Sequence, residues 1–89
     1  MIRKELASKR DFTLLEFYNY IGLLAREVLS QHFRWKELPE LFREAIFEDF
    51  QKPIYINNIL YTKEEIFEEF QDDFVKYIED VLNEELVEV

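Results

Sequence analysis

The sequence predicts a small, mainly α-helical domain with a minor β component: two helices, a short β-hairpin and a long C-terminal amphipathic helix. Apolar residues recur at three-and-four spacing in three segments, which indicates helices with one buried side. One glycine and two prolines in 89 residues leave few places for sharp turns. Hydrophobic residues make up 48% of the chain, too many for a disordered segment, and no linker divides it. We therefore expect one domain over residues 1–89.

The first predicted helix begins after a short charged lead-in, where Asp11 or Thr13 can cap it, and extends to about Phe33. Tyr20 and Leu23 interrupt the otherwise polar strip on its far side, so we expect them to be exposed contacts. Its buried side is predicted to comprise Leu14, Phe17, Tyr18, Ile21, Leu24, Ala25, Val28 and Leu29.

The second predicted helix starts near Leu38, has Pro39 in its first turn and ends before Pro53. Phe47 falls opposite its apolar arc, and either packs against another element or lies exposed. Trp35, between the two helices, is either an anchor for a partner or a side chain that closes the end of the core.

Residues 54–61 carry β-branched and aromatic residues on both sides of Asn57 and Asn58, which tolerate the left-handed backbone of a tight turn. This pattern predicts a two-stranded hairpin, with an extended connector as the alternative, because an isolated hairpin is marginally stable.

The last predicted helix begins at a capping box formed by Thr62 and Glu65, in which each side chain bonds a free backbone donor. It should extend to about Asn83 or Leu86. One side of this helix is predicted to be apolar, with Ile66, Phe67, Phe70, Phe74, Tyr77, Ile78, Val81 and Leu82.

The opposite side of the last helix is almost wholly acidic, and Lys76 is the only basic residue in its arc. From Glu64 onward, six i,i+4 pairs are repulsive and two are attractive, which costs the helix about 1 to 2 kcal/mol. A face chosen only for solubility could alternate its charges, so the single sign favours a basic partner over a merely solvated surface. The acidic residues are Glu65, Glu68, Glu69, Asp72, Asp73, Glu79 and Asp80.

The net charge of −9 is unevenly distributed, with +3 over residues 1–36 and −12 over residues 37–89. Such a charge argues against binding to anionic membranes and against direct binding to nucleic acid. No apolar run is long enough for a signal peptide or a membrane span. The lack of cysteine fits a reducing compartment, and we expect the protein in the cytoplasm.

Residues suited to catalysis or metal binding are scarce. The chain has no cysteine, two serines and one histidine, His32, which is expected to have a structural or capping role at the end of the first helix. The acidic segments lack both the glycine-containing loop of a calcium site and the Glu-x-x-His pairs of a di-metal bundle. We expect no enzymatic activity, no metal and no cofactor.

These observations favour a protein-binding module, such as an inhibitor, an immunity protein or a regulatory protein, that docks on a basic surface of a partner. The size and charge are typical of phage anti-defence and bacterial immunity proteins, an analogy of type alone. Seven acids over about 22 Å also approach the phosphate spacing of a DNA strand, so nucleic-acid mimicry is geometrically possible. The alternative is an assembly protein that self-associates through exposed residues, namely Tyr20, Leu23, Phe47 or Trp35.

Overall fold

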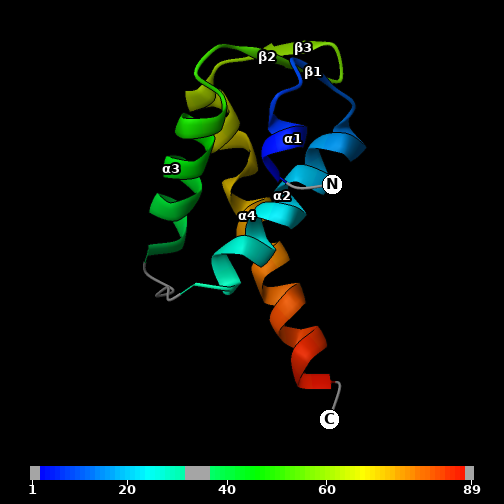
Figure 1. The fold of residues 1–89 in the computed structure, drawn as a ribbon, viewed down its shortest axis with the longest axis vertical. Coiled ribbons are helices and arrows are strands. Elements are labelled where there is room, and N and C mark those ends of the chain that lie inside the picture. The colour runs from blue at the N-terminus through cyan, green and yellow to red at the C-terminus, as the bar shows by residue number, and fades with distance from the viewer. Residues whose placement is uncertain (1–2, 32–36, 88–89) are drawn as a thin grey trace.

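The computed structural model describes residues 3–31 and 37–87, with side chains described as far as Asn83. Over these residues the chain forms four helices and a small sheet of three strands (Figure 1). The prediction of a mainly α-helical domain with a minor β component is confirmed. In chain order the elements are α1 (Arg3–Ala7), β1 (Asp11–Phe12), α2 (Leu14–Leu29), α3 (Leu38–Asp49), β2 (Ile54–Ile56), β3 (Ile59–Tyr61) and α4 (Lys63–Val87).

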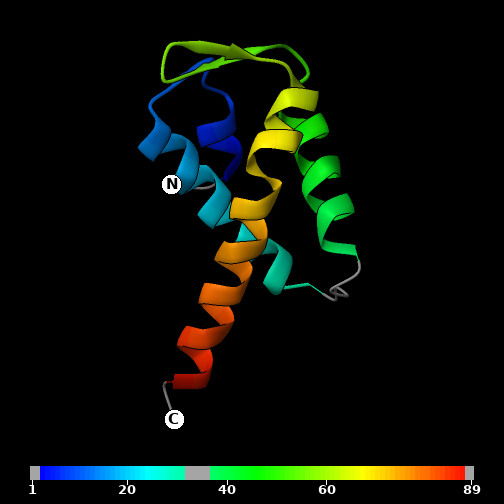
Figure 2. The ribbon, with the colours of Figure 1, turned by 180° about the vertical axis from the view of Figure 1, so that it is seen from behind.

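Helix α4 is the long axis of the molecule. Its 25 residues extend about 37 Å, close to the longest dimension of 41 Å, and both α2 and α3 pack against it. The sheet closes one end of this helical layer, and the last turns of α4 project beyond α2 and α3 at the other end (Figures 1 and 2).

The sheet has the order β1-β2-β3, with β1 parallel to β2 and β2 antiparallel to β3. The predicted hairpin is confirmed, since Ile56 pairs with Ile59 across a two-residue turn. Asn57 and Asn58 have φ angles of 54° and 67°, the left-handed backbone that a type I′ turn requires. The parallel pairing of β1 with β2 was not predicted.

Helix α2 begins at Thr13, whose hydroxyl accepts a hydrogen bond from the backbone of Glu16 while the Glu16 carboxylate accepts one from the backbone of Thr13. Thr13 is therefore the cap, and Asp11 belongs to β1. The helix ends at Leu29, so the predicted end near Phe33 was wrong. The Ser30 hydroxyl donates to the carbonyl of Glu27 at 2.7 Å, and the chain leaves the helix there.

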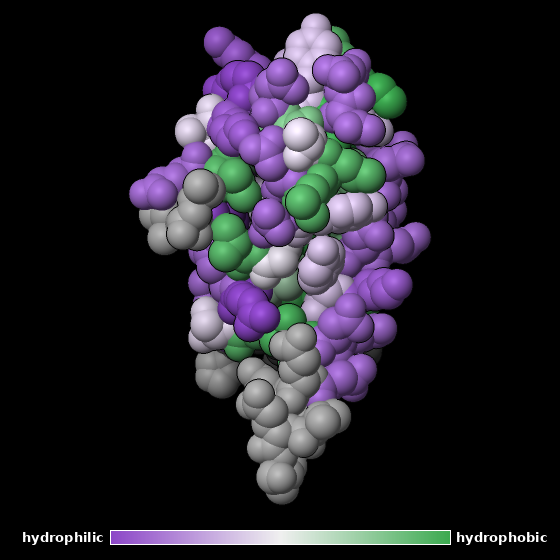
Figure 3. All heavy atoms as spheres, turned by 90° about the vertical axis from the view of Figure 1, so that its right-hand side faces the viewer, coloured by the Kyte–Doolittle hydropathy of each residue, from purple (hydrophilic) through white to green (hydrophobic). Residues whose placement is uncertain are grey.

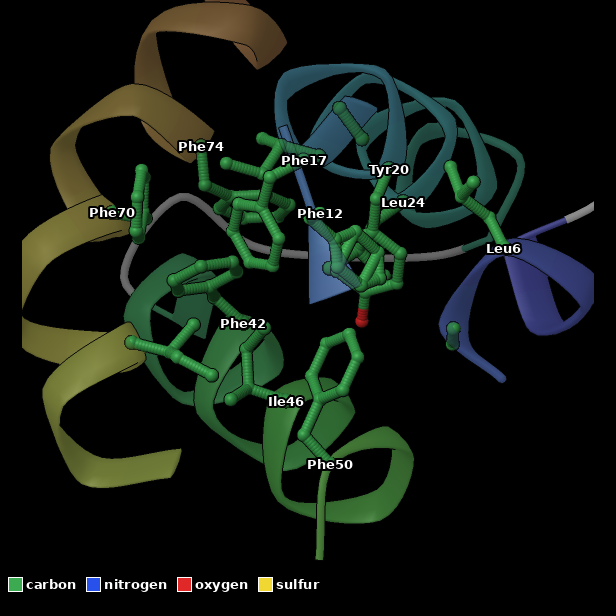
Figure 4. Packing of buried hydrophobic residues seen from close by; sticks show 14 of the residues in the cluster. Leu6, Phe12, Phe17, Tyr20, Leu24, Phe42, Ile46, Phe50, Phe70 and Phe74 are labelled. Carbon is green, nitrogen blue, oxygen red and sulfur yellow. The ribbon is translucent and has the colours of Figure 1, made fainter. Parts of the chain in front are cut away.

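The core is rich in aromatic side chains, and the buried ones come from β1, from α2, from α3 with its C-cap, and from α4 (Figure 4). Phe12 of β1 and Phe17 of α2 meet edge to face, with ring centroids 5.5 Å apart. Phe42 of α3 stacks on Phe74 of α4 at 4.9 Å, which joins the two helices. The predicted apolar sides of the second and last helices are confirmed, because their residues are buried or packed against this core. Leu14, predicted for the buried side of the first helix, is instead exposed, so that prediction was wrong.

Candidate functional site

Helix α4 begins at the predicted capping box of Thr62 and Glu65. The Thr62 hydroxyl accepts a hydrogen bond from the Glu65 backbone at 3.2 Å, and the Glu65 carboxylate accepts one from the Thr62 backbone at 3.0 Å. From there Ile66, Phe70 and Phe74 are buried at four-residue spacing. This burial turns the opposite side of the helix toward solvent.

The predicted acidic residues lie on that solvent side. Six of them are exposed and Asp73 is half-buried. Figure 3 shows the result as a hydrophilic column along the right-hand margin, the side on which α4 lies. We call the following seven residues the acidic face: Glu65, Glu68, Glu69, Asp72, Asp73, Glu79 and Asp80.

Ion pairs are concentrated elsewhere in the molecule. Arg3 pairs with Glu27 and Asp49, and Lys4 pairs with Glu48 at 3.4 Å, so the basic N-terminal segment is bound to α2 and α3. Lys9 of the same segment pairs with Glu16. Among the described side chains, no ion pair involves a carboxylate of the acidic face. Within the part of the chain that the structure describes, these carboxylates therefore form no contact ion pair, and Lys76 is the one basic residue in the same arc of the helix.

Hydrogen bonds donated by Arg3 to Glu27 and Asp49, and by Lys9 to Glu16, hold these pairs together. Burial disfavours the charge of Arg3, but the hydrogen bonds to Glu27 and Asp49 outweigh it and raise the pKa of the guanidinium. The hydrogen bond from Lys9, followed by that from the Thr13 backbone, lowers the pKa of the Glu16 carboxyl.

Tyr20 is fully buried, so the prediction that it is an exposed contact was wrong. Its hydroxyl donates to the Asp49 carboxylate of α3 at 2.6 Å, and Arg3 binds the same carboxylate. The polar end of the ring is thus satisfied inside the molecule, while the ring itself packs on Phe50 at 5.1 Å. Burial, followed by the bond to Asp49, raises the pKa of the Tyr20 phenol far above its ordinary value.

The other predicted contacts are less exposed than expected or lie outside the described residues. Leu23 and Phe47 are half-buried and pack against the core. The ring of Phe47 also has Arg43 and Lys63 over it, at 4.6 and 4.9 Å from its centroid, which settles its two alternatives in favour of packing. Trp35, like His32, is outside the described residues.

A hollow of about 330 Å³ adjoins the acidic face between α2 and α4. Tyr18 and Tyr77 line it together with Asp73, Lys76 and Asp80, and the two rings lie 6.5 Å apart. Burial, with the charge of Asp73 next, raises the pKa of the Tyr18 phenol. Both tyrosines were predicted to belong to the core. Their position at the margin of the apolar side was the only signal that they could also reach the surface.

A wider open groove of about 500 Å³ runs beside this hollow and shares Tyr18 and Tyr77 with it. Leu6, Gly22 and Leu23 contribute to its floor and walls. In Figure 3, apolar and near-neutral side chains gather in the middle of the face, beside the hydrophilic column. The acidic face thus borders a concave surface that offers apolar contact.

Among the described side chains of residues 3–31 and 37–83, no group of three or more potential ligands is arranged to bind a metal ion. Within residues 3–31 and 37–87, no helix has the length and apolar character needed to cross a bilayer. Comparison of this chain with protein-family models, with curated proteins and with solved structures gave no significant match.

Proposed function

We propose that this protein is a small acidic binding module that docks on a basic surface of a partner protein in the cytoplasm and inhibits or regulates that partner. An immunity protein that neutralises a basic toxin belongs to the same class. The observation that carries the proposal is the acidic face of α4, whose carboxylates share one side of a helix and enter no ion pair among the described residues.

The distribution of the ion pairs supports this proposal. Basic side chains of the N-terminal segment pair with acids of α2 and α3, although the acids of α4 are more numerous and more closely spaced. A surface of one sign accelerates association with an oppositely charged surface and disfavours partners of like charge. The cost of the repulsive pairs in α4 is offset when a basic partner supplies the missing charges.

The hollow beside the acidic face supports a cationic contact within the docking surface. An arginine or lysine side chain placed there would meet the rings of Tyr18 and Tyr77 and the carboxylates of Asp73 and Asp80, whose two negative charges outnumber the one positive charge of Lys76 in the same lining. Aromatic faces and carboxylates both attract cations, and together they give such a contact orientation as well as charge.

Nucleic-acid mimicry is the more specific form of the proposal. The seven acids from Glu65 to Asp80 extend over about 22 Å of helix, or about one charge per 3 Å. The phosphates along one DNA strand have a similar spacing, about 3.4 Å. A basic channel that normally accepts nucleic acid would then be the surface that is blocked, and competition between this protein and DNA for the partner would distinguish this form from general charge attraction.

The test compares two double variants with the same change in charge. Glu68→Lys with Asp72→Lys reverses two exposed acids of the acidic face, whereas Glu40→Lys with Glu44→Lys reverses two exposed acids of α3 at the same spacing. Both variants change the net charge from −9 to −5. Each is used to capture proteins from the native host at low salt, and the affinity for the captured partner is then measured.

We expect the α4 variant to lose affinity by about tenfold or more, and the α3 variant to bind nearly as the unaltered protein does. Equal losses in the two variants would show that only net charge matters. Undiminished binding by the α4 variant would exclude the acidic face as the docking surface.

A further inference from the structure

The exposed large apolar side chains of the described residues gather at the sheet end of the molecule. They lie on β2, on β3 and in the first turn of α2, which follows β1 directly. The pairing register brings the start of α2 to the same end of the sheet as the Asn57–Asn58 turn, because Phe12 lies opposite Ile56. These side chains are Leu14, Leu15, Tyr55, Ile59 and Leu60.

Strand β3 is an edge of the sheet with open backbone groups. The N–H groups of Tyr55 and Asn57 bond the carbonyls of Arg10 and Phe12, so these residues of β2 point toward β1. The backbone N–H and C=O of Ile56 therefore point toward β3, where Ile56 and Ile59 form a hydrogen-bonded pair. The next pair along the ladder, Tyr55 with Leu60, is a non-hydrogen-bonded pair. The N–H and C=O of Leu60 consequently point outward from the sheet.

The two edges of the sheet differ in how they are protected. The β1 edge carries the exposed charge of Asp11 and follows the basic Arg10, the kind of residue that discourages strand pairing. The β3 edge has neither charge nor proline, and residues 54–61 contain no charged residue in a chain that is 35% charged. An extended strand can reach Leu60 without meeting charge on β3.

We propose that the edge of β3 pairs with β3 of a second copy of this chain, antiparallel and centred on Leu60. The two Leu60 residues then exchange N–H to C=O hydrogen bonds across a two-fold axis, and the three-stranded sheets join into one of six strands. The next donor, the N–H of Thr62, is already bonded to Glu65, so the ladder is short and the dimer reversible.

Self-complementarity identifies a second copy as the occupant. In this register Ile59 lies opposite Tyr61 of the other copy. Ile59 is 58% exposed, although it is on the core-facing side of the sheet with Ile56 and Phe12. On the outer side, Leu60 at 51% exposure meets its own counterpart beside Tyr55 at 49%. Each exposed side chain of the edge thus gains an apolar neighbour.

Charge also favours this end for contact between two copies. Two molecules of net charge −9 repel each other through α4, and the uncharged hairpin is where they approach with the least repulsion. Added salt screens the remaining repulsion and should therefore strengthen the dimer, whereas it weakens binding to a basic partner. The proposal does not depend on the proposed function.

The experiment is sedimentation equilibrium of the whole chain from low micromolar to millimolar concentration, with NMR measurement of exchange at the Leu60 amide. Leu60→Lys places a charge on the edge, and Leu60→Pro removes the outward donor without touching a bond to β2. Leu15→Lys is the matched control, because Leu15 is 71% exposed at the same end but outside the sheet. Circular dichroism establishes that each variant is folded.

We expect a monomer–dimer equilibrium whose dissociation constant rises by about tenfold or more in both Leu60 variants and little in Leu15→Lys. The Leu60 amide should exchange more slowly as concentration rises. A monomer throughout the range, a dimer indifferent to Leu60→Lys, or an equal loss in Leu15→Lys would each overturn the proposal. Protection of Leu60 only by a strand of another protein would overturn the choice of occupant.

Discussion

Tyr20 is a single side chain that joins three parts of the chain. Its hydroxyl donates to Asp49 of α3, and the same carboxylate binds Arg3 of α1. The substitution Tyr20→Phe keeps the ring in the core but removes the hydrogen bond from the hydroxyl to the buried carboxylate of Asp49. We expect the free energy of unfolding, measured in urea, to fall by about 1 to 2 kcal/mol, whereas Tyr55→Phe on the exposed sheet face should change little.

The same residue makes stability depend on alkaline pH. The pKa of Tyr20 is raised in the folded state, so its contribution is complete below the pKa of the unfolded chain, about 10, and is lost as the pH rises above it. Stability should therefore decline faster in the unaltered protein than in Tyr20→Phe. The difference between the two should shrink in urea titrations above pH 10, and a constant difference would contradict this account.

The prediction that Tyr20 is exposed was wrong for a physical reason. A helical wheel places Tyr20 among polar neighbours, and it assumes that a helix is buried on one side only. In the fold, α1 packs against α2 and Asp49 reaches Tyr20 from 29 positions away in the chain, so α2 is buried on more than one side. Local periodicity carries no information about either contact.

At the scale of the element, α2 contains a glycine that the helix does not need. A side chain at Gly22 would meet the ring of Tyr77 at 3.7 Å, an ordinary contact distance. Gly22→Ala should therefore raise the free energy of unfolding by about 0.5 to 1 kcal/mol, because alanine loses less backbone entropy in a helix. Urea denaturation measures the gain, and a loss of stability would show that the Tyr77 ring cannot yield.

The elements that the sequence predicted are those whose signals are local. The capping box of Thr62 and Glu65, Pro39 in a first turn and the Asn57–Asn58 pair each act through neighbouring residues, and each marks an observed boundary or turn. Strand β1 has only two residues and exists because β2 pairs with it from more than 40 positions away. Helix α1 is five residues long, too short to be stable without its packing on α2.

The candidate site likewise has one part that local sequence signals predict and another part that they do not. The acidic face follows from helical periodicity alone, and the structure describes its seven residues as exposed or half-buried. The hollow that Tyr18 and Tyr77 form beside it required knowledge of how α2 packs on α4. The direction of the Leu60 backbone likewise required the pairing of β1 with β2, which no local pattern indicated.

At the scale of the whole molecule, the free protein should become more stable as salt is added. The repulsion along α4 is screened when the Debye length falls from about 10 Å at 0.1 M to about 3 Å at 1 M. Melting curves in sodium chloride should show a rising transition temperature, and Glu68→Lys with Asp72→Lys should reduce the rise because it lowers the net negative charge of α4 by four. A transition temperature that falls with salt would contradict the unneutralised charge of the acidic face.

The charged side of α4 and the uncharged hairpin of residues 54–61 should respond to ionic strength in opposite directions. Under the two proposals, the helix attracts basic partners in dilute electrolyte, where copies of the chain repel one another. In concentrated electrolyte that attraction is screened and the edges of β3 can pair. Ionic strength would thus decide which assembly the protein enters. A screen for its partner carried out in strong salt would recover the protein bound to itself.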